Sequence, residues 1–218
     1  MKRLLTLSVM LTLCMLTFAT DFMRIKLKDG NIVRYEMKSI EEVDFEIGKD
    51  TSIIEDSTAI DISETPLKFV STSDSTVEVT KDDSYKELKT VTIPAKVRID
   101  GKVYDVTGIG EQAFHTCYML TSLEMPASIK SIGDWAFAYC EYLKDLKISS
   151  DLVNIGYYAF FNCTALTEMA LPSSVATIED AAFEDCENLD LTIDNSAENV
   201  TVGSDVFKGC KSVTWLKD

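Results

Sequence analysis

The sequence predicts an α/β solenoid, a domain in which short repeats stack along one axis. Three observations predict this class. A pattern headed by isoleucine restarts at Ile109, Ile132, Ile155 and Ile178, which gives a period of 23 residues. Part of each copy alternates apolar residues with period two, as a strand does, and another part spaces them by three and four, as a helical turn does. Because so short a unit cannot bury its own apolar face, we expect the copies to stack on one another.

Residues 1–20 have the layout of a secretory signal peptide. Lys2-Arg3 form a positive head, and the segment from Leu4 to Phe18 carries no charge. This apolar stretch is shorter than the ~20 residues that a spanning helix needs. A retained membrane anchor remains an alternative. A lipid-attached Cys14 is another, although Leu13 occupies the position where a small residue normally precedes such a cysteine.

Two different segments follow the predicted signal peptide. Residues 21–47 alternate apolar and polar positions on both sides of Asp29-Gly30, which predicts a small β-hairpin with a further strand around Val43–Phe45. Residues 48–66 are acidic and rich in serine and threonine, which predicts a linker.

Residues 67–108 are predicted to form a β-rich N-terminal cap. They contain several short apolar alternations and a hairpin turn at Asp100-Gly101. A stack of repeats exposes the apolar face of its first coil, so a cap is expected at this place.

Residues 109–218 hold about five repeats, each with an Ala-Phe-x-x-Cys segment and a Leu-x-x-Leu segment. We expect the leucine segments to form a short parallel β-sheet and the Ala-Phe-x-x-Cys segments to form short helices. The aromatic and thiol positions recur at the repeat period and are predicted to form the structural core of the stack. They are Phe114, Phe137, Phe160, Phe183 and Phe207, with Cys117, Cys140, Cys163, Cys186 and Cys210.

The pattern Ile-Gly-x-x-Ala-Phe-x-x-Cys-x-x-Leu-x-x-Leu-x-Leu-Pro resembles the leucine-rich repeats of the BspA-like family over about residues 88–218. The resemblance implies a curved solenoid, export from a bacterium, and binding or adhesion to proteins. It implies no cofactor and no catalytic residue. The fourth repeat departs from the pattern, because its strand has lost a residue and about two residues are added before Val202.

Composition narrows the classes of function. Acidic residues number 36 against 21 basic ones, a net charge of -15, and such a surface repels the phosphate backbone of nucleic acids. His115 is the single histidine, which argues against His-rich metal sites and histidine-based catalysis. We expect it to be an exposed surface residue. No Gly-rich phosphate loop follows a strand, and nothing supports a Ser-His-Asp arrangement. The sequence therefore predicts a protein that is not an enzyme, with no small-molecule substrate, and an enzyme is kept as the last alternative.

The repeated cysteines and a group of acids permit more than one interpretation. The cysteines lack the close pairs of a metal site. Stacking brings equivalent positions to about 5 Å, which permits disulfides, but we favour buried free thiols. The acids invite a calcium interpretation, but they lack the spacing and central glycine of a dedicated loop. A solvated acidic edge is the favoured alternative. These acids are Glu179, Asp180, Glu184, Asp185 and Glu187.

Aromatic residues gather at variable positions of the predicted helical side. Either they pack against neighbouring turns, or they form a protein-binding patch, since exposed aromatics are enriched at binding hot spots. Trp135 and Tyr158 occupy the same repeat position, so stacking places them side by side. The candidate protein-binding residues are Trp135, Tyr139, Tyr157, Tyr158 and Phe161.

Together with the family resemblance, these features predict an exported, non-enzymatic protein-binding module that is secreted or held at the cell surface or in the periplasm of a bacterium. The expected partner is a host matrix protein, a cell-surface protein or another envelope protein. The alternative is a structural or assembly component of the envelope with no host ligand.

Overall fold

A computed structural model describes residues 22–26, 32–36 and 58–217. The predicted signal peptide and the predicted strand around Val43 lie outside the described residues. The chain divides into two compact units, Met1–Glu55 and Asp56–Asp218. In the first unit, β1 (Phe22–Lys26) pairs antiparallel with β2 (Ile32–Glu36), as the alternation around Asp29-Gly30 predicts.

The second unit begins with a cap of strands and short 3₁₀ helices. Strand β5 pairs antiparallel with β4 and parallel with β8, and β7 and β8 form an antiparallel hairpin. The turn of that hairpin is Asp100-Gly101, where both residues have positive φ, as a type I′ turn requires. The elements are β3 (Ile60–Asp61), η2 (Ile62–Glu64), β4 (Lys68–Ser71), β5 (Thr76–Thr80), η3 (Asp83–Glu87), β7 (Lys96–Ile99) and β8 (Lys102–Ile109).

The cap starts earlier than the sequence predicts. Strand β3 pairs parallel with β7, so the cap includes residues that were assigned to the linker 48–66. The composition of this stretch is acidic and polar, but Ile60 packs against the core. Fully buried Val77 and Val79 lie on β5, beside the first coil of the stack.

Six strands follow the leucine pattern and form parallel sheets, which the sequence predicts. Strand β6, within the predicted cap, pairs with β9 and so extends this sheet by one strand ahead of the first coil. The sheet is divided, because β6, β9 and β11 form one set and β13, β15 and β17 another. Their bounds are β6 (Thr90–Thr92), β9 (Ser122–Glu124), β11 (Asp145–Lys147), β13 (Glu168–Leu171), β15 (Asp190–Ile193) and β17 (Ser212–Trp215).

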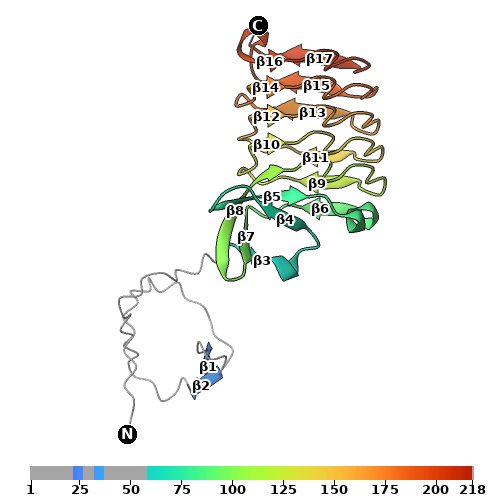
Figure 1. Ribbon diagram of the computed structural model, residues 1–218. Helices are drawn as coiled ribbons and strands as arrows, with labels where there is room; N and C mark the ends of the chain where they lie inside the picture. The colour runs from blue at the N-terminus through green and yellow to red at the C-terminus, as the bar shows by residue number, and fades with distance from the viewer. Residues whose placement is uncertain (1–21, 27–31, 37–57, 218) are drawn as a thin grey trace. The chain divides into compact units, whose positions relative to one another are not determined.

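A second column of parallel strands, which the sequence analysis did not predict, continues from the end of β8. Each strand is two residues long. Ile132, Ile155 and Ile178 are buried, whereas Val202 in the last strand is exposed and pairs with Ile178 of the coil before it. Figure 1 shows this column beside the column of leucine strands. Its members are β10 (Ser131–Ile132), β12 (Asn154–Ile155), β14 (Thr177–Ile178) and β16 (Thr201–Val202).

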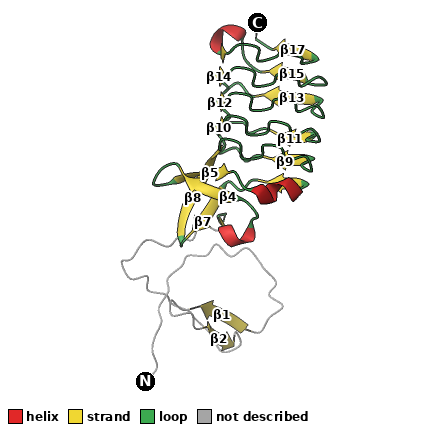
Figure 2. Ribbon diagram, turned by 45° about the vertical axis from the view of Figure 1, so that its right-hand side comes forward, coloured by secondary structure: helices red, strands yellow, loops and turns green. Residues whose placement is uncertain are grey.

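The short helix predicted in each repeat was wrong, and with it the α part of the α/β class. The described residues contain no α-helix. Their helices, red in Figure 2, are the two 3₁₀ turns of the cap and η4 (Ala197–Asn199) in the irregular fourth repeat. The Ala-Phe-x-x-Cys segments are successive turns instead. We call residues 110–117, 133–140, 156–163, 179–186 and 203–210 the turn ladder.

Hydrogen bonds between coils replace the helix. In the second coil the backbone N–H groups of Trp135, Phe137 and Tyr139 donate to carbonyls of the third coil, each at 2.8 Å. The N–H groups between them donate within their own coil, three residues back, as Ala138 does to Trp135. A helix keeps all these bonds inside one segment. Because N–H groups that donate to the next coil alternate with N–H groups that donate within the coil, each coil bonds the backbone carbonyls of its neighbour as a paired strand would.

Two residues in every coil of the turn ladder adopt positive φ, four positions apart. In the second coil they are Trp135 (φ 56°) and Tyr139 (φ 61°), and in the third Tyr158 and Asn162. An α-helix cannot contain such residues. The three- and four-residue spacing of apolar positions fits this pair of turns as well as it fits a helix.

Rings and thiols fill the interior of the stack. Phe114, Phe137, Phe160 and Phe183 are fully buried and stack nearly parallel, with successive ring centroids 5.1–5.3 Å apart. Tyr85 of the cap extends this column, since its centroid lies 5.2 Å from that of Phe114. No helix within the described residues is both long enough and apolar enough to cross a membrane.

Candidate functional site

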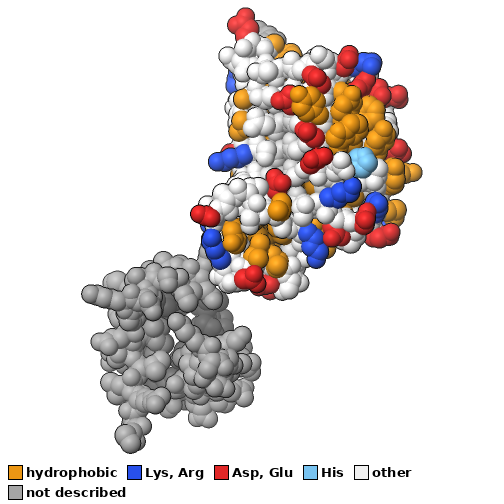
Figure 3. Space-filling model, in the orientation of Figure 1, with side chains coloured by type: hydrophobic (Ala, Val, Ile, Leu, Met, Phe, Trp, Pro, Cys, Tyr) orange, Lys and Arg blue, Asp and Glu red, His pale blue; other side chains and the backbone are white. Residues whose placement is uncertain are grey.

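Aromatic side chains from three successive coils meet on the outer side of the turn ladder. We call this cluster the aromatic flank. Figure 3 shows hydrophobic side chains gathered on one side of the coils, next to the histidine. The residues of the aromatic flank are His115, Trp135, Tyr139, Tyr158 and Phe161.

The rings of the aromatic flank form one connected network. Trp135 stacks on Tyr158, with centroids 4.4 Å apart and planes 16° from parallel. The edge of Phe161 meets both rings and also Tyr139, at centroid distances between 5.2 and 6.2 Å. Such pairs contribute about 0.5–1.5 kcal/mol each beyond the area that they bury. The stack predicted from the shared repeat position of Trp135 and Tyr158 is therefore present.

His115 joins the network, which the sequence analysis missed. It is half-buried rather than an exposed surface residue, and its ring makes edge contacts with Trp135 and Tyr139. Burial, followed by the nearby Lys81 and Lys86, lowers the pKa of His115. Its repeat position is the one that Phe161 fills two coils later, and this shared position is the signal that could have placed it here.

The members of the aromatic flank are less exposed than the aromatic side chains that follow or precede them in the chain. The five members are half-buried, so both interpretations of the sequence hold in part: the rings pack on neighbouring coils and still reach the surface. Tyr157 is 44% exposed and lies outside the ring contacts given for the described residues. Residues just after the turn ladder in the first two coils have larger exposed fractions than Tyr157: Tyr118 (48%), Met119 (45%) and Tyr142 (63%).

The aromatic flank occupies several backbone positions whose conformation disfavours bulky side chains. Trp135, Tyr139 and Tyr158 have positive φ, a conformation that glycine adopts freely and bulky side chains rarely adopt. The equivalent positions of the last coil hold Asp205 and Gly209, which tolerate it better. The coil itself thus does not require aromatic residues here, and these rings are present despite a steric penalty.

The predicted core positions lie inside, with two exceptions at the last coil. The first four phenylalanines and the first four cysteines of the two series are buried, whereas Phe207 and Cys210 are half-buried. The structure has the five repeat cysteines as free thiols. The thiols of Cys140, Cys163 and Cys186 each donate a hydrogen bond of 3.1 Å to a phenylalanine carbonyl of the preceding coil.

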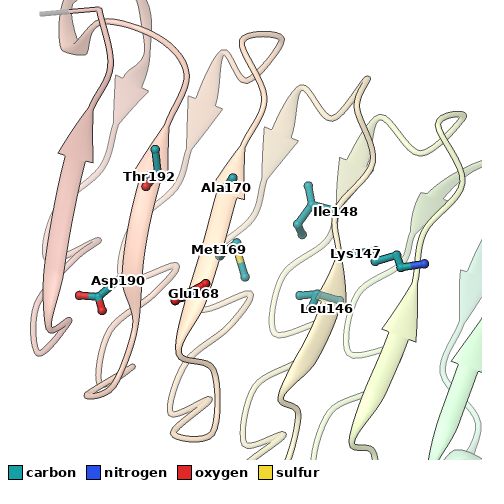
Figure 4. A pocket seen from close by; sticks show the side chains of 8 residues that line it. All are labelled: Leu146, Lys147, Ile148, Glu168, Met169, Ala170, Asp190 and Thr192. Carbon is teal, nitrogen blue, oxygen red and sulfur yellow. The ribbon is translucent and has the colours of Figure 1, made fainter.

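The face formed by the leucine strands carries a shallow hollow between the two sets of these strands. Its volume is about 740 Å³. Figure 4 shows Leu146 and Ile148 in one coil and Met169 in the next, with Glu168 on the strand of Met169 and Asp190 on the strand after that. The hollow lies where β11 and β13 do not pair, and the inward-facing Leu146 is only half-buried there.

The described residues offer few clusters of acidic, thiol or imidazole side chains that could bind a metal ion. No group of three or more His, Cys, Asp or Glu side chains among these residues is placed to hold a metal ion. The acids of the fourth coil lie along its surface, where Glu184 pairs with Lys208 of the next coil.

Comparisons with known proteins agree with this architecture. The BspA type leucine rich repeat region matches residues 84–214 in six copies, and six is also the number of leucine strands. A leucine-rich repeat protein of T. pallidum is 26% identical, with a TM-score of 0.59 over 67% of each chain. A leucine-rich repeat protein of Bacteroides capillosus is 35% identical, with a TM-score of 0.52 over 58% of this chain and 94% of that one. The comparison with curated proteins gives no match. The chain therefore belongs to the BspA-type leucine-rich repeat family, whose repeats are a protein-interaction type of module.

Proposed function

We propose that the protein is an exported, non-enzymatic module that binds another protein through the aromatic flank. The observation that carries the proposal is the connected network of His115, Trp135, Tyr139, Tyr158 and Phe161 at the surface. Exposed apolar patches larger than scattered single residues mark interaction sites. Tyrosine and tryptophan are the residues most enriched at the energetic centres of such sites.

The steric penalty at positive φ supports an interface role for these rings. Trp135 and Tyr158 hold a backbone conformation that asparagine, aspartate or glycine would hold with less strain. The stacking between them recovers part of this penalty. A partner that covers Tyr157 and the outer edges of Trp135 and Tyr158 would bury them further and supply a reason for their presence.

Two features support the proposal that the protein is exported: its N-terminal segment and its family. The positive head and uncharged stretch of residues 1–20 support secretion. The partner is then a protein outside the cytoplasm, either on a host surface or matrix or within the bacterial envelope. A partner from the envelope of the producing cell would favour the structural or assembly role over adhesion.

The experiment is affinity capture with the purified chain and with a Trp135→Ser, Tyr158→Ser double variant. Because both rings are half-buried, the melting temperature of the variant is measured first. A Tyr157→Ser variant, altered at an exposed side chain, serves as a second test that spares the ring network. We expect both variants to lose the partners that the parent captures from host-matrix or envelope extracts. Undiminished capture by a folded double variant would exclude the aromatic flank as the interface.

A further inference from the structure

Tyr157 precedes Tyr158 of the aromatic flank in the chain and lies between carboxylates of the neighbouring coils. Its repeat position is held by Asp134 in the coil before and Asp180 in the coil after, and stacked coils bring such positions side by side. The N–H of Tyr157 donates to Oδ1 of Asp134 at 3.0 Å. The N–H of Ser204 donates to Oδ1 of Asp180 at 2.7 Å. Backbone hydrogen bonds therefore hold both carboxylates in place before any ligand arrives, which lowers the entropy lost on binding.

The electrostatic field at Tyr157 is negative. The charges of Glu179 and Asp180 raise the pKa of its hydroxyl, and slight burial, the charge of Asp134 and a hydrogen bond with Glu179 add to the effect. Glu179 occupies the position that glycine holds in the other coils, so it adds a carboxylate that the repeat pattern does not require. A cation near the Tyr157 ring would relieve this field.

The turn-ladder segments around Tyr157 carry acids but no bases, whereas Lys81 and Lys86 of the cap lie near His115 at the other end of the aromatic flank. The first four coils of the turn ladder, residues 110–117, 133–140, 156–163 and 179–186, contain no lysine or arginine. One of their carboxylates, that of Glu184, pairs with Lys208 of the fifth coil. The acidic residues of these four segments are Glu111, Asp134, Glu179, Asp180, Glu184 and Asp185.

We propose that the partner presents a cationic segment to this surface, with an arginine or lysine side chain seated against the Tyr157 ring between Asp134 and Asp180. This inference rests on the proposed function and names the chemistry of its ligand. An aromatic face attracts a cation, and the fixed carboxylates on either side supply charge complementarity. Arginine fits better than lysine, because its planar guanidinium can stack on a ring while it donates to a carboxylate.

The test uses three labelled peptides of equal length in a Gly-Ser background, one rich in arginine, one in lysine and one in glutamate. Each is titrated against the purified chain, and fluorescence anisotropy reports binding. The test variant is Glu179→Gln, Asp180→Asn, which keeps an amide oxygen for the Ser204 N–H. The matched control is Asp145→Asn, Glu168→Gln, which removes the same charge from exposed residues of the leucine strands.

We expect the arginine peptide to bind most tightly and the glutamate peptide not to bind. The Glu179→Gln, Asp180→Asn variant should lose about tenfold in affinity for the arginine peptide, and Tyr157→Ser about three- to tenfold. The control should change by less than about twofold, as expected for charges away from the contact.

Two results overturn the inference. One is an equal loss in the control, which would mean attraction by the net charge of the chain alone. The other is absence of any preference for basic over acidic peptides. The proposed function fails or holds separately from this inference. If the Trp135→Ser, Tyr158→Ser variant loses its partner while the Glu179→Gln, Asp180→Asn variant keeps it, the aromatic flank is still the interface. The inference of a cationic ligand is then wrong.

Discussion

Each regular repeat contributes one phenylalanine ring to a stack that runs through the molecule. Phe160 has a ring on both sides, with Phe137 at 5.2 Å and Phe183 at 5.1 Å, and no exposed surface. Phe207 at the last coil is half-buried, and its ring meets only the edge of Trp215, at 6.4 Å, among the ring contacts of the described residues. The same side chain thus has different surroundings in the middle and at the end of the stack.

Truncation of these two rings should have unequal effects. Removal of a fully buried phenylalanine typically lowers the free energy of unfolding by ~3–5 kcal/mol. We predict a loss in this range for Phe160→Ala and a clearly smaller loss for Phe207→Ala, measured by urea unfolding. Equal losses would mean that stability does not depend on position in the stack.

The buried thiols make stability depend on pH. Burial raises the pKa of Cys117 and of Cys210 to about 11 and that of Cys186 to about 12, from an ordinary value of 9.0. Above pH 9 the unfolded chain loses thiol protons that the folded chain keeps, so the free energy of unfolding falls as pH rises. Tyr85, whose pKa burial raises to about 12, acts in the same direction at higher pH.

We therefore predict that the stability conferred by the protonated thiols is complete below about pH 9 and is lost as pH rises towards 11 to 12. Urea unfolding at pH 8 and pH 10 measures the change. A Cys117→Ala, Cys210→Ala variant should show a weaker dependence on pH. Greater stability of the parent chain at pH 10 than at pH 8 would contradict the raised pKa values.

At the scale of elements, the turn ladder depends on close approach between coils. A Cβ on Gly156 would lie 2.8 Å from the backbone N of Asp134 and 2.8 Å from the carbonyl carbon of Gly133. These atoms belong to the preceding coil and are fixed by the hydrogen bonds between coils. Glycine at position 156 therefore permits the close approach of this coil to the preceding one.

We predict that Gly156→Ala lowers the free energy of unfolding by about 1–3 kcal/mol, as forced overpacking does. The matched control is Glu179→Ala, because the same repeat position already carries a side chain in the next coil. That control should change stability by about 0.5 kcal/mol or less. If thermal unfolding shows no difference between the two variants, the contact at Gly156 does not limit the approach of the coils.

The elements show which patterns in the sequence carry structural information. The leucine strands follow from Leu-x-x-Leu, because alternation reports a half-buried strand directly. The strands headed by Ser131 and Asn154 escape such a search because each is two residues long. The predicted helices fail because the residues with positive φ are tryptophan and tyrosine rather than glycine, so nothing in the local sequence marks Trp135 or Tyr139 as a turn position.

Part of the candidate site could also be predicted from the sequence. The stack of Trp135 on Tyr158 follows from their shared repeat position. The burial of His115 and the negative field at Tyr157 could not be predicted, because both depend on which side chains of adjacent coils come together. Repeat spacing gives the neighbours of a residue but not the direction of its side chain.

At the scale of the whole molecule, each coil contacts only its neighbours, so stability is distributed along one dimension. Deletion of residues 133–155 removes one period and joins Ile132 to Gly156, which restores a regular Ile-Gly junction. In the shortened chain Phe114 would stack on Phe160. The repeat architecture thus predicts that the stack closes again after the loss of one complete coil.

We predict that this deletion variant still unfolds cooperatively, at a lower melting temperature than the parent. Removal of residues 133–144, about half a period, should instead destroy the fold, because the two strand columns would lose their register. The complete deletion also removes Trp135 and Tyr139 from the aromatic flank, so binding should be lost although the fold remains. Cooperative melting of both deletions would contradict a fold defined by the 23-residue period.

The central claim is that the aromatic flank, and not the sheet of leucine strands, binds the partner. Site-specific photocrosslinking tests it most directly, with p-benzoylphenylalanine placed at Tyr157 or, for comparison, at Asp145 on β11, both of which are exposed. After irradiation of the producing bacterium, alone and in contact with host matrix, mass spectrometry identifies the crosslinked proteins. We predict a discrete crosslinked partner from position 157 and none from position 145. Crosslinks from position 145 alone would contradict the account and place the interface on the sheet of leucine strands.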